Sequence, residues 1–186
     1  MSTDEWQKEV YQLANELATG ENYKTIIDIG CGSGYKLIHQ LGNFDTTGIE
    51  VNPTFNFLKE KYPERNWLLF DSVSPNTLKA DLLVCADVIE HLPNPDDLLE
   101  FISEIDFQEL LISTPERDAV AGRKDFGPPE NTAHYREWNA IEFKIYLRQW
   151  FDVKEQHIFE GRSVTQVVRC RKTYKFENWE FENLKM

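Results

Sequence analysis

The sequence predicts an α/β fold: a doubly wound, mostly parallel seven-stranded sheet with an antiparallel hairpin at one edge and a leading N-terminal helix. Strand and helix patterns alternate from residue 25 to residue 114, which is typical of parallel strands covered by helices on both faces. Two β-like runs close the pattern, 153–160 and 163–170, and the short link between them contains Gly161 and predicts a hairpin. Apolar residues at helical spacing over 4–18 predict the leading helix.

Each element in the first half of the chain has its own sequence signal. A helix is predicted to begin near Ser33, because the apolar residues that follow it recur at helical spacing. The next helix is predicted to have Asn52 as its N-cap and Pro53 as its first helical residue, a common start signal. The strands predicted here are 25-TIIDI-29, 46-TTGIE-50 and 67-WLLF-70.

The second half repeats these signals. Asn94 and Pro95 open another helix, and acidic residues in its first turn suit the helix dipole. After a long loop at 115–138, a further helix is predicted to begin at Asn139, where Glu142 completes a capping box. The strands predicted in this half, before the closing hairpin, are 81-DLLVCA-86 and 109-ELLIST-114.

Length and composition indicate one globular domain over residues 1–186. A chain of 186 residues, 41% of them hydrophobic, is long enough for one sizeable core. We divide it into a leading helix (1–20), a core (21–170) and an aromatic, acidic tail (171–186) whose role the sequence does not define.

Charge and cysteine content narrow the possible functions. The net charge of −12 leaves little basic surface for phosphates, so no nucleic-acid partner is expected. The N-terminus has no apolar signal segment, and no apolar run is long enough to span a bilayer, which predicts a cytoplasmic protein without stable membrane insertion. Cys31, Cys85 and Cys170 are too far apart in sequence to indicate a disulfide framework or a zinc site. The oligomeric state is left open.

Three glycines follow the first predicted strand. Gly30, Gly32 and Gly34, here called the glycine loop, fall where that strand turns into a helix. Glycine permits a tight turn and lets the backbone approach a ligand closely. Backbone N–H groups at a helix start can also hold an anion. On its own this loop is also compatible with a purely structural turn.

Acidic residues stand at the ends of the neighbouring strands. Glu50 ends the second predicted strand, where a carboxylate can accept hydrogen bonds from ribose hydroxyls. Asp71 follows the third strand, where it can accept from an adenine amino group, and Asp87 follows the fourth. Because parallel strands end at one edge of a sheet, these side chains are expected to converge on one cleft.

Together, the segments DIGCGSG, GIE, FDS and ADLLVCADVIEHL resemble class I S-adenosylmethionine-dependent methyltransferases. The resemblance is close over about residues 25–114 and looser elsewhere. A dinucleotide-binding loop would read G-x-G-x-x-G, but here the third glycine comes one residue early and Tyr35 occupies the later position. The resemblance implies a Rossmann-like core and S-adenosylmethionine as the cofactor.

The resemblance also assigns roles to the residues at the strand ends. It implies that the glycine loop cradles the methionine part of the donor and that Asp28 helps to hold its amino group. Glu50 would bind the ribose, and Asp71, with the backbone near Ser72, would bind adenine. Asp87 is expected to line the same pocket, although it also fits a solvated loop. An acidic pocket suits a cationic sulfonium.

Two histidines are candidate catalytic residues. An oxygen acceptor needs a base to take its proton, and a histidine can do this near neutral pH. His91 lies just beyond the fourth strand, and His134 lies in the long loop, a kind of segment that is often functional. Each is equally compatible with a role in positioning its loop. His39 and His157 are predicted to be surface or packing residues.

The long loop also supplies the candidate substrate-binding residues. Tyr135 and Arg136 adjoin His134, and an Arg can bind a carboxylate or phosphate of an acceptor. The stretch 113-STPERD-118, followed by GPPENTAHYREW, resembles small bacterial methyltransferases of cell-surface glycans. That resemblance implies an oxygen of a sugar or glycan precursor as the acceptor. The EHL tract resembles quinone-biosynthesis methyltransferases, so a phenol is an alternative.

Other interpretations are a catalytically silent S-adenosylmethionine-binding module, a nicotinamide-dependent oxidoreductase, and a nucleic-acid or protein methyltransferase. The glycine spacing disfavours the oxidoreductase, and the net charge disfavours a nucleic-acid enzyme. No Asn-Pro-Pro-Tyr-type tetrapeptide, often found after strand 4 in amino-directed nucleic-acid enzymes, follows the fourth strand. No metal is predicted, because the sequence does not show that Asp87, Glu90, His91 and Asp118 meet.

Overall fold

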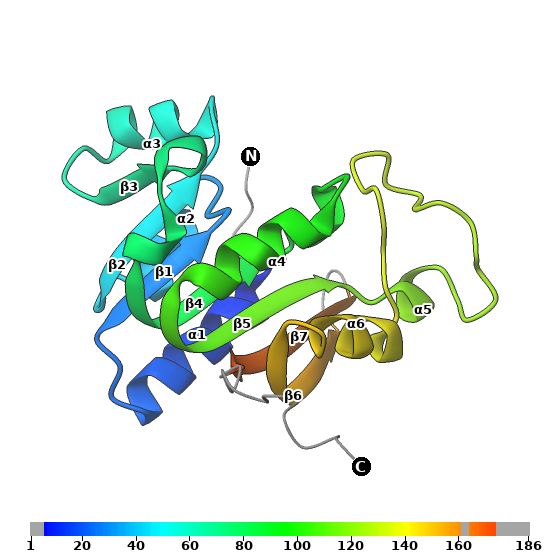
Figure 1. Cartoon of the computed structure of the whole chain (residues 1–186). Helices are drawn as coiled ribbons and strands as arrows, with labels where there is room; N and C mark the ends of the chain where they lie inside the picture. Colours follow the sequence, from blue (N-terminus) through cyan, green and yellow to red (C-terminus); the bar gives the residue numbers. More distant parts are fainter. Residues whose placement is uncertain (1–5, 161–163, 174–186) are drawn as a thin grey trace, which may run out of the picture.

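The computed structural model describes residues 6–160 and 164–173. The link at Gly161 and the aromatic residues of the tail therefore lie outside the described residues. Nine strands and α-helices precede the long loop and its short helix α5, and the closing hairpin follows α6 (Figure 1). In chain order the elements are α1 (Lys8–Gly20), β1 (Thr25–Ile29), α2 (Tyr35–Gln40), β2 (Asp45–Glu50), α3 (Thr54–Lys61), β3 (Asn66–Leu69), the 3-10 turns η1 (Phe70–Ser72) and η2 (Pro75–Thr77), β4 (Lys79–Ala86), the 3-10 turn η3 (Ile89–His91), α4 (Pro95–Glu104), β5 (Asp106–Pro115), α5 (Arg117–Val120), α6 (Ala140–Leu147), β6 (Phe151–Glu160) and β7 (Val164–Lys172).

The strands form one seven-stranded sheet in the order β3-β2-β1-β4-β5-β7-β6. The pairs among β1 to β5 are parallel, whereas β7 runs antiparallel to both β5 and β6. The predicted fold class, including the antiparallel hairpin at the edge, is confirmed. The chain runs outward from β1 to β3 and then returns to place β4 on the other side of β1. This reversal of strand order creates the crevice in which open α/β sheets bind ligands.

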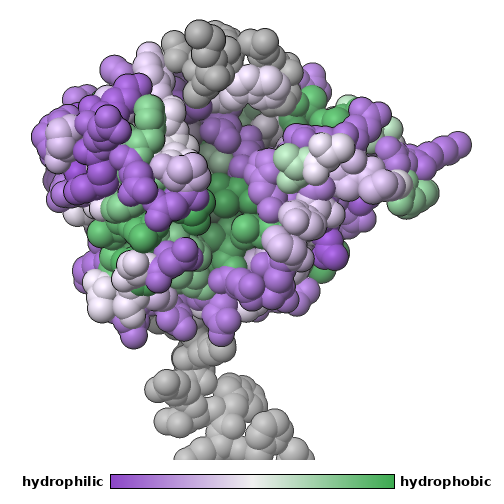
Figure 2. Space-filling view, turned by 90° about the horizontal axis from the view of Figure 1, so that it is seen from above, coloured by the Kyte–Doolittle hydropathy of each residue, from purple (hydrophilic) through white to green (hydrophobic). Residues whose placement is uncertain are grey.

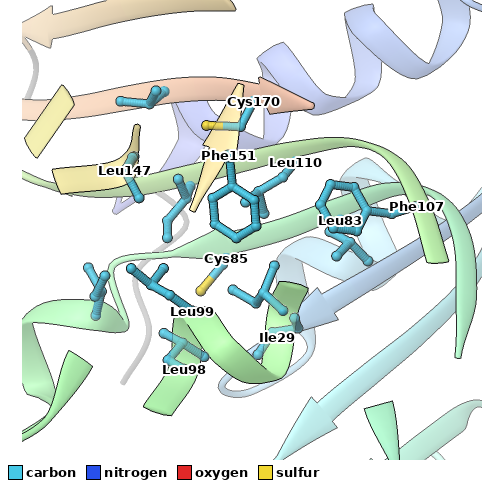
Figure 3. Close-up of a cluster of buried hydrophobic side chains, with 14 of the residues drawn as sticks. Ile29, Leu83, Cys85, Leu98, Leu99, Phe107, Leu110, Leu147, Phe151 and Cys170 are labelled. Atoms are coloured by element: carbon cyan, nitrogen blue, oxygen red, sulfur yellow. The ribbon is translucent and has the colours of Figure 1, made fainter. Parts of the chain in front are cut away.

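Helices cover both faces of the sheet, because strand side chains alternate between two apolar clusters. On one face, Ile27, Ile29 and Cys85 pack with residues of α4 and α6. On the other face, Ile26 and Val84 pack with residues of α1, α2 and α3. Figure 1 shows α4 in front of the sheet and α1 behind it. Figure 3 shows the first cluster, in which side chains of β1, β4, β5 and β7 meet those of α4 and the segment from α6 to β6.

Several element boundaries differ from those predicted. Helix α2 begins at Tyr35 rather than near Ser33, because the glycine loop continues through Gly34, which has a left-handed conformation. Pro53 is the N-cap of α3 rather than its first helical residue, so Asn52 lies outside the helix. Trp6, placed on the predicted apolar stripe of the leading helix, lies before α1 and is 44% exposed.

The capping box predicted for α6 is present. The Asn139 side chain accepts from the backbone N–H of Glu142 at 2.9 Å, and the Glu142 carboxylate accepts from the N–H of Asn139 at 3.2 Å. Just before it, Gln166 of β7 donates to the carbonyl of Trp138 at 2.7 Å. These contacts fix the end of the long loop, which contains α5 and forms a β-bridge between Glu116 and Trp138.

Ile102 tests the packing of α4 on the sheet. Its side chain is fully buried in the first cluster. We expect Ile102→Ala to lower the free energy of unfolding by about 2–5 kcal/mol, because it leaves a cavity under the helix. Glu100→Ala, at an exposed position of the same helix, should change it by no more than about 0.5 kcal/mol in the same urea titration. Equal effects of the two changes would contradict the assigned packing.

Candidate functional site

The parallel strands end at one edge of the sheet, and the predicted donor-site residues lie along it. Glu50 ends β2, and Asp71 lies in η1, directly after β3. Asp87 follows β4, next to the strand that carries Asp28. In Figure 2 the surface seen from above is hollowed, with hydrophobic residues on the floor of the hollow and hydrophilic residues around it.

The glycine loop requires glycine at its first and last positions. Gly30 and Gly34 have φ angles of 75° and 71°, in the left-handed region. A Cβ on Gly30 would lie 2.4 Å from a methyl group of Val88, and one on Gly34 would lie 2.8 Å from the Trp67 ring. Gly32 also has a positive φ, but a Cβ there would meet nothing within 4 Å. The loop is therefore packed against the protein at both ends and open in the middle.

Glu50 closes the glycine loop through its carboxylate. One oxygen accepts from the backbone N–H of Gly32 and the other from that of Val51, both at 2.8 Å. The Gly32 N–H, expected to be available to an anion, is thus used by Glu50. Each carboxylate oxygen has a second lone pair, so Glu50 can still accept hydrogen bonds from two ligand hydroxyls.

Asp28 is a fully buried carboxyl group beneath this loop. The Tyr11 hydroxyl donates to its Oδ2 at 2.7 Å, while Oδ1 is buried without a hydrogen-bond partner. Burial raises the pKa of Asp28 to about 7, against the lowering effect of the Tyr11 hydrogen bond. The unpartnered oxygen and the displaced pKa suit a group that receives a cationic amine.

Tyr11 was not identified from the sequence. It adjoins Val10 on the apolar stripe of α1, and its burial could have been inferred from that stripe. Its hydroxyl partner could not, because the pairing depends on how α1 docks against β1. The leading helix therefore supplies part of the candidate site.

Asp87 is held in a strained turn at the end of β4. Its φ is 52°, which is uncommon for a residue with a side chain. Ser113 of β5 donates its hydroxyl to Asp87 Oδ1 at 2.6 Å and accepts from the Asp87 N–H at 3.1 Å. Burial raises the pKa of Asp87, while the Ser113 hydrogen bond opposes the rise. Asp71 and Ser72 are exposed in η1.

The structure brings the two candidate catalytic histidines together. The ring centroids of His91 and His134 lie 4.7 Å apart, with the rings nearly perpendicular. His91 Nδ1 lies 3.0 Å from the Ala133 carbonyl, and the Tyr135 N–H donates to the Glu90 carbonyl at 2.8 Å. The long loop is thereby fastened to η3, at the edge of the sheet.

Glu137 fixes the orientation of His134. The Glu137 carboxylate lies 2.6 Å from His134 Nδ1, and both side chains are less than 10% exposed. Because the carboxylate can only accept, Nδ1 carries the proton and the neutral ring presents Nε2 as an acceptor. Asn131 lies 2.9 Å from that Nε2. Glu137 was missed in the sequence, where its spacing of three from His134 was the available signal.

A pocket of about 990 Å³ opens beside these histidines. His134, Tyr135 and Arg136 all line it, as predicted for an acceptor site in the long loop. Arg136 lies over the Trp138 ring at 5.9 Å, and Trp138 stacks on Tyr146 with centroids 5.7 Å apart. Aromatic lining also comes from Trp6 and Phe126.

The other histidines and Asp118 do not line this pocket. His39 packs against Tyr35, with ring centroids 4.2 Å apart, and His157 lies on the edge strand β6. Asp118 is in α5, where it pairs with Arg117 at 3.6 Å. The three cysteines are free thiols in buried positions. None of the helices in the described residues is long and apolar enough to cross a bilayer.

The residues at the strand ends fit S-adenosylmethionine. Asp28 offers an unpartnered buried oxygen to an amino group, and Glu50 offers unused lone pairs to the ribose. The open middle of the glycine loop leaves room for a ligand to approach its backbone. The surrounding carboxyl groups suit a cationic sulfonium.

Comparison with known proteins gives one family and several similar structures. The statistical model of a family described as a methyltransferase domain matches residues 3–180. The ubiquinone biosynthesis O-methyltransferase of Glaesserella parasuis serovar 5 (strain SH0165) is 28% identical over 122 residues, covering 58% of this chain and 52% of that protein. The chain thus spans about half the length of this curated relative.

Solved structures show the same fold at low identity. The methyltransferase domain of bacterial CtHen1 is 20% identical with a TM-score of 0.65, over 89% of this chain and 98% of that one. The magnesium protoporphyrin IX methyltransferase ChlM of Synechocystis PCC 6803, solved with bound S-adenosylhomocysteine (SAH), is 15% identical with a TM-score of 0.67, over 90% and 84%.

Asp28 is expected to make the ligand-free protein less stable as the pH rises from about 4 to about 7. Its pKa is near 3.8 in an unfolded chain and about 7 in the fold, so between these values the folded state holds the extra proton. The free energy of unfolding of the wild type, relative to that of Asp28→Asn, should therefore fall by about 2–4 kcal/mol over this range. Urea titrations at several pH values measure this; a constant difference would refute the raised pKa.

Proposed function

The chain belongs to the methyltransferase domain family, and on that premise we propose that it transfers a methyl group from S-adenosylmethionine to a hydroxyl oxygen of a sugar or glycan precursor. The observation that carries the proposal is the aromatic pocket beside His91 and His134. It lies where the long loop is fastened to the edge of the sheet that also carries the donor-site residues.

On the donor side, different residues bind different parts of the cofactor. Asp28 receives the amino group, the glycine loop accommodates the methionine part, and Glu50 binds the ribose hydroxyls. Asp71, with the backbone near Ser72, binds the adenine, and Asp87 lines the pocket. When bound, the cofactor supplies a methyl group on a sulfonium that is already activated for displacement, so alignment accounts for much of the catalysis.

On the acceptor side, the pocket lining favours a neutral polyhydroxylated group. Aromatic faces such as those of Trp6 and Phe126 suit the apolar faces of a sugar, and Asn131 offers both donors and acceptors to hydroxyls. The acids of the lining outnumber its arginines, and Arg117 is already paired with Glu142 at 2.8 Å. This balance opposes a polyphosphate such as a nucleic acid. Tyr135 and Arg136 are the proposed substrate contacts at the mouth.

Removal of the acceptor proton is assigned to the histidine pair. Nδ1 of each ring is held by an acceptor, so Nε2 is the nitrogen that takes the proton of a substrate hydroxyl. At His134 the hydroxyl would displace the Asn131 amide, which lies 2.9 Å from Nε2. Glu137 stabilises the positive charge that His134 gains when it takes that proton.

A phenol related to quinone precursors is the second candidate acceptor. The same aromatic lining suits a planar ring, and the similar protein of Glaesserella parasuis is named as a ubiquinone biosynthesis O-methyltransferase. Product formation from panels of glycosides and phenols decides between the two. A silent binding module would bind the donor and methylate neither panel.

Glu50→Ala is expected to weaken S-adenosylmethionine binding by about 10-fold or more, because two hydrogen bonds to a charged group are lost. Isothermal titration calorimetry on the purified protein measures this. Asp45→Ala, at the exposed opposite end of β2, is the matched control and should bind normally. Thermal unfolding of Glu50→Ala shows whether the loss has a structural cause, since Glu50 also closes the glycine loop. A folded Glu50→Ala with unchanged affinity would refute the ribose assignment.

His134→Ala is expected to lower kcat by about 100-fold or more while leaving the donor affinity within about 3-fold of the wild type. Initial rates with the best acceptor from the panels, together with calorimetry, give both quantities. His91→Ala should likewise lower kcat without changing donor affinity, and His157→Ala on β6 should behave like the wild type. Full turnover in both site variants would remove the histidine pair from the mechanism.

A further inference from the structure

Glu90, His91 and His134 form a cluster in the described part of the chain. One ligand atom from each of the three side chains lies within 4.8 Å of the other two. Two come from η3 and the third from the long loop, which is fastened there by the Tyr135 N–H to Glu90 carbonyl hydrogen bond. Their convergence is therefore built by contacts between distant segments and does not depend on a single flexible turn.

Glu90 is the unusual member of the cluster. The residue is 1% exposed, and neither carboxylate oxygen has a hydrogen-bond partner. Thr114 lies close enough to lower the pKa of this carboxyl, but its hydroxyl makes no well-formed hydrogen bond either. A buried carboxylate without donors needs another positive partner to be stable.

No protein cation in the described segments supplies that partner. None of the ion pairs between Lys or Arg and an acid within residues 6–160 and 164–173 includes Glu90. The two histidine rings come close, each with one nitrogen within 4.8 Å of a Glu90 carboxyl oxygen. An unpartnered carboxyl group and two imidazole rings thus converge on one small volume.

The orientation of both histidines is that of metal ligands. In metal sites, a ligating imidazole usually donates its second N–H to a carboxylate or a backbone carbonyl. His134 has such a partner in Glu137 at 2.6 Å, and His91 has one in the Ala133 carbonyl at 3.0 Å. With Nδ1 carrying the proton in each ring, Nε2 is the nitrogen left to ligate, and an ion would displace the Asn131 amide from that of His134. The Asn131 amide that approaches His134 Nε2 at 2.9 Å lies in the exposed loop.

The geometry points to a divalent transition-metal ion bound by Glu90, His91 and His134, with the open coordination positions available to the acceptor hydroxyl. Two imidazoles and one carboxylate are the protein ligands of many catalytic zinc sites and also suit Mn²⁺, Fe²⁺ and Co²⁺. Nitrogen ligands make Ca²⁺ and Mg²⁺ poor candidates.

If the ion is bound, it replaces the histidine pair as the group that makes the acceptor hydroxyl give up its proton, and the two rings hold the ion instead; this part rests on the proposed function. A hydroxyl bound to the ion loses its proton at a lower pH than in water. The O–H bond breaks, the proton passes to solvent, and the oxygen takes the methyl group as the carbon–sulfur bond of the donor breaks. The sulfonium becomes a neutral thioether, so the charges balance.

Metal binding is tested on untagged protein from which metals have been removed with a chelator. Co²⁺ is titrated while its visible absorption bands are recorded, and the zinc content after equilibrium dialysis is measured by mass spectrometry. We expect about one ion per chain. His134→Ala and Glu90→Gln should each weaken binding by about 10-fold or more, whereas His157→Ala should bind like the wild type. His91→Ala should weaken binding as His134→Ala does. Because His91 is exposed, its removal should leave the fold intact, so weaker binding in this variant reports on the site and not on a folding defect.

The outcomes separate this inference from the proposed function. Absence of Co²⁺ and Zn²⁺ binding, or binding that survives all three cluster substitutions in folded protein, overturns the metal site. Calorimetry with S-adenosylmethionine on the metal-free protein tests the donor site independently, because no donor-site residue is among the proposed ligands. Donor binding without metal binding would therefore refute only the metal site, and metal binding without donor binding would refute only the donor assignment.

Discussion

The attachment of the long loop to η3 is the constraint on which the candidate site depends. The Tyr135 N–H donates to the Glu90 carbonyl, and His91 contacts the Ala133 carbonyl from the other side. These contacts bring a segment that follows β5 back to the residues that follow β4. Without them His134 would have no fixed position relative to His91, and the part of the long loop that lines the aromatic pocket would not be held at η3.

Buried carboxyl groups are the second feature of this edge. Asp28, Asp87 and Glu90 all have raised pKa values because burial disfavours their charged forms. A sheet built only for stability would place apolar residues there. Proteins tolerate such costs mainly at functional sites, where a ligand supplies the missing partner. The arrangement is consistent with a cationic donor near Asp28 and, in our proposal, a metal ion near Glu90.

Much of the fold could be predicted from the sequence, because its signals are local. The β-branched run at 25–29, the Asn–Pro start of α4 and the capping box at Asn139 each determine an element within a few residues. The alternation of strands and helices then limits the topology. Errors arose where local signals compete, as at Pro53, where a typical first helical residue serves as the N-cap.

The site could be predicted only in part, because its remaining features depend on tertiary contacts. The glycine loop and Glu50 have sequence patterns, and the structure places them together. No sequence pattern indicates the hydrogen bond of Tyr11 to Asp28, the support of His134 by Glu137 or the missing partners of Glu90.

The most direct test of the account is a crystal structure with S-adenosylhomocysteine, measuring the distance from its sulfur to the His91–His134 pair. We predict that the sulfur lies at the opening between the glycine loop and the aromatic pocket, facing the histidines. A sulfur directed away from that pocket, or a ligand bound elsewhere, would contradict the account.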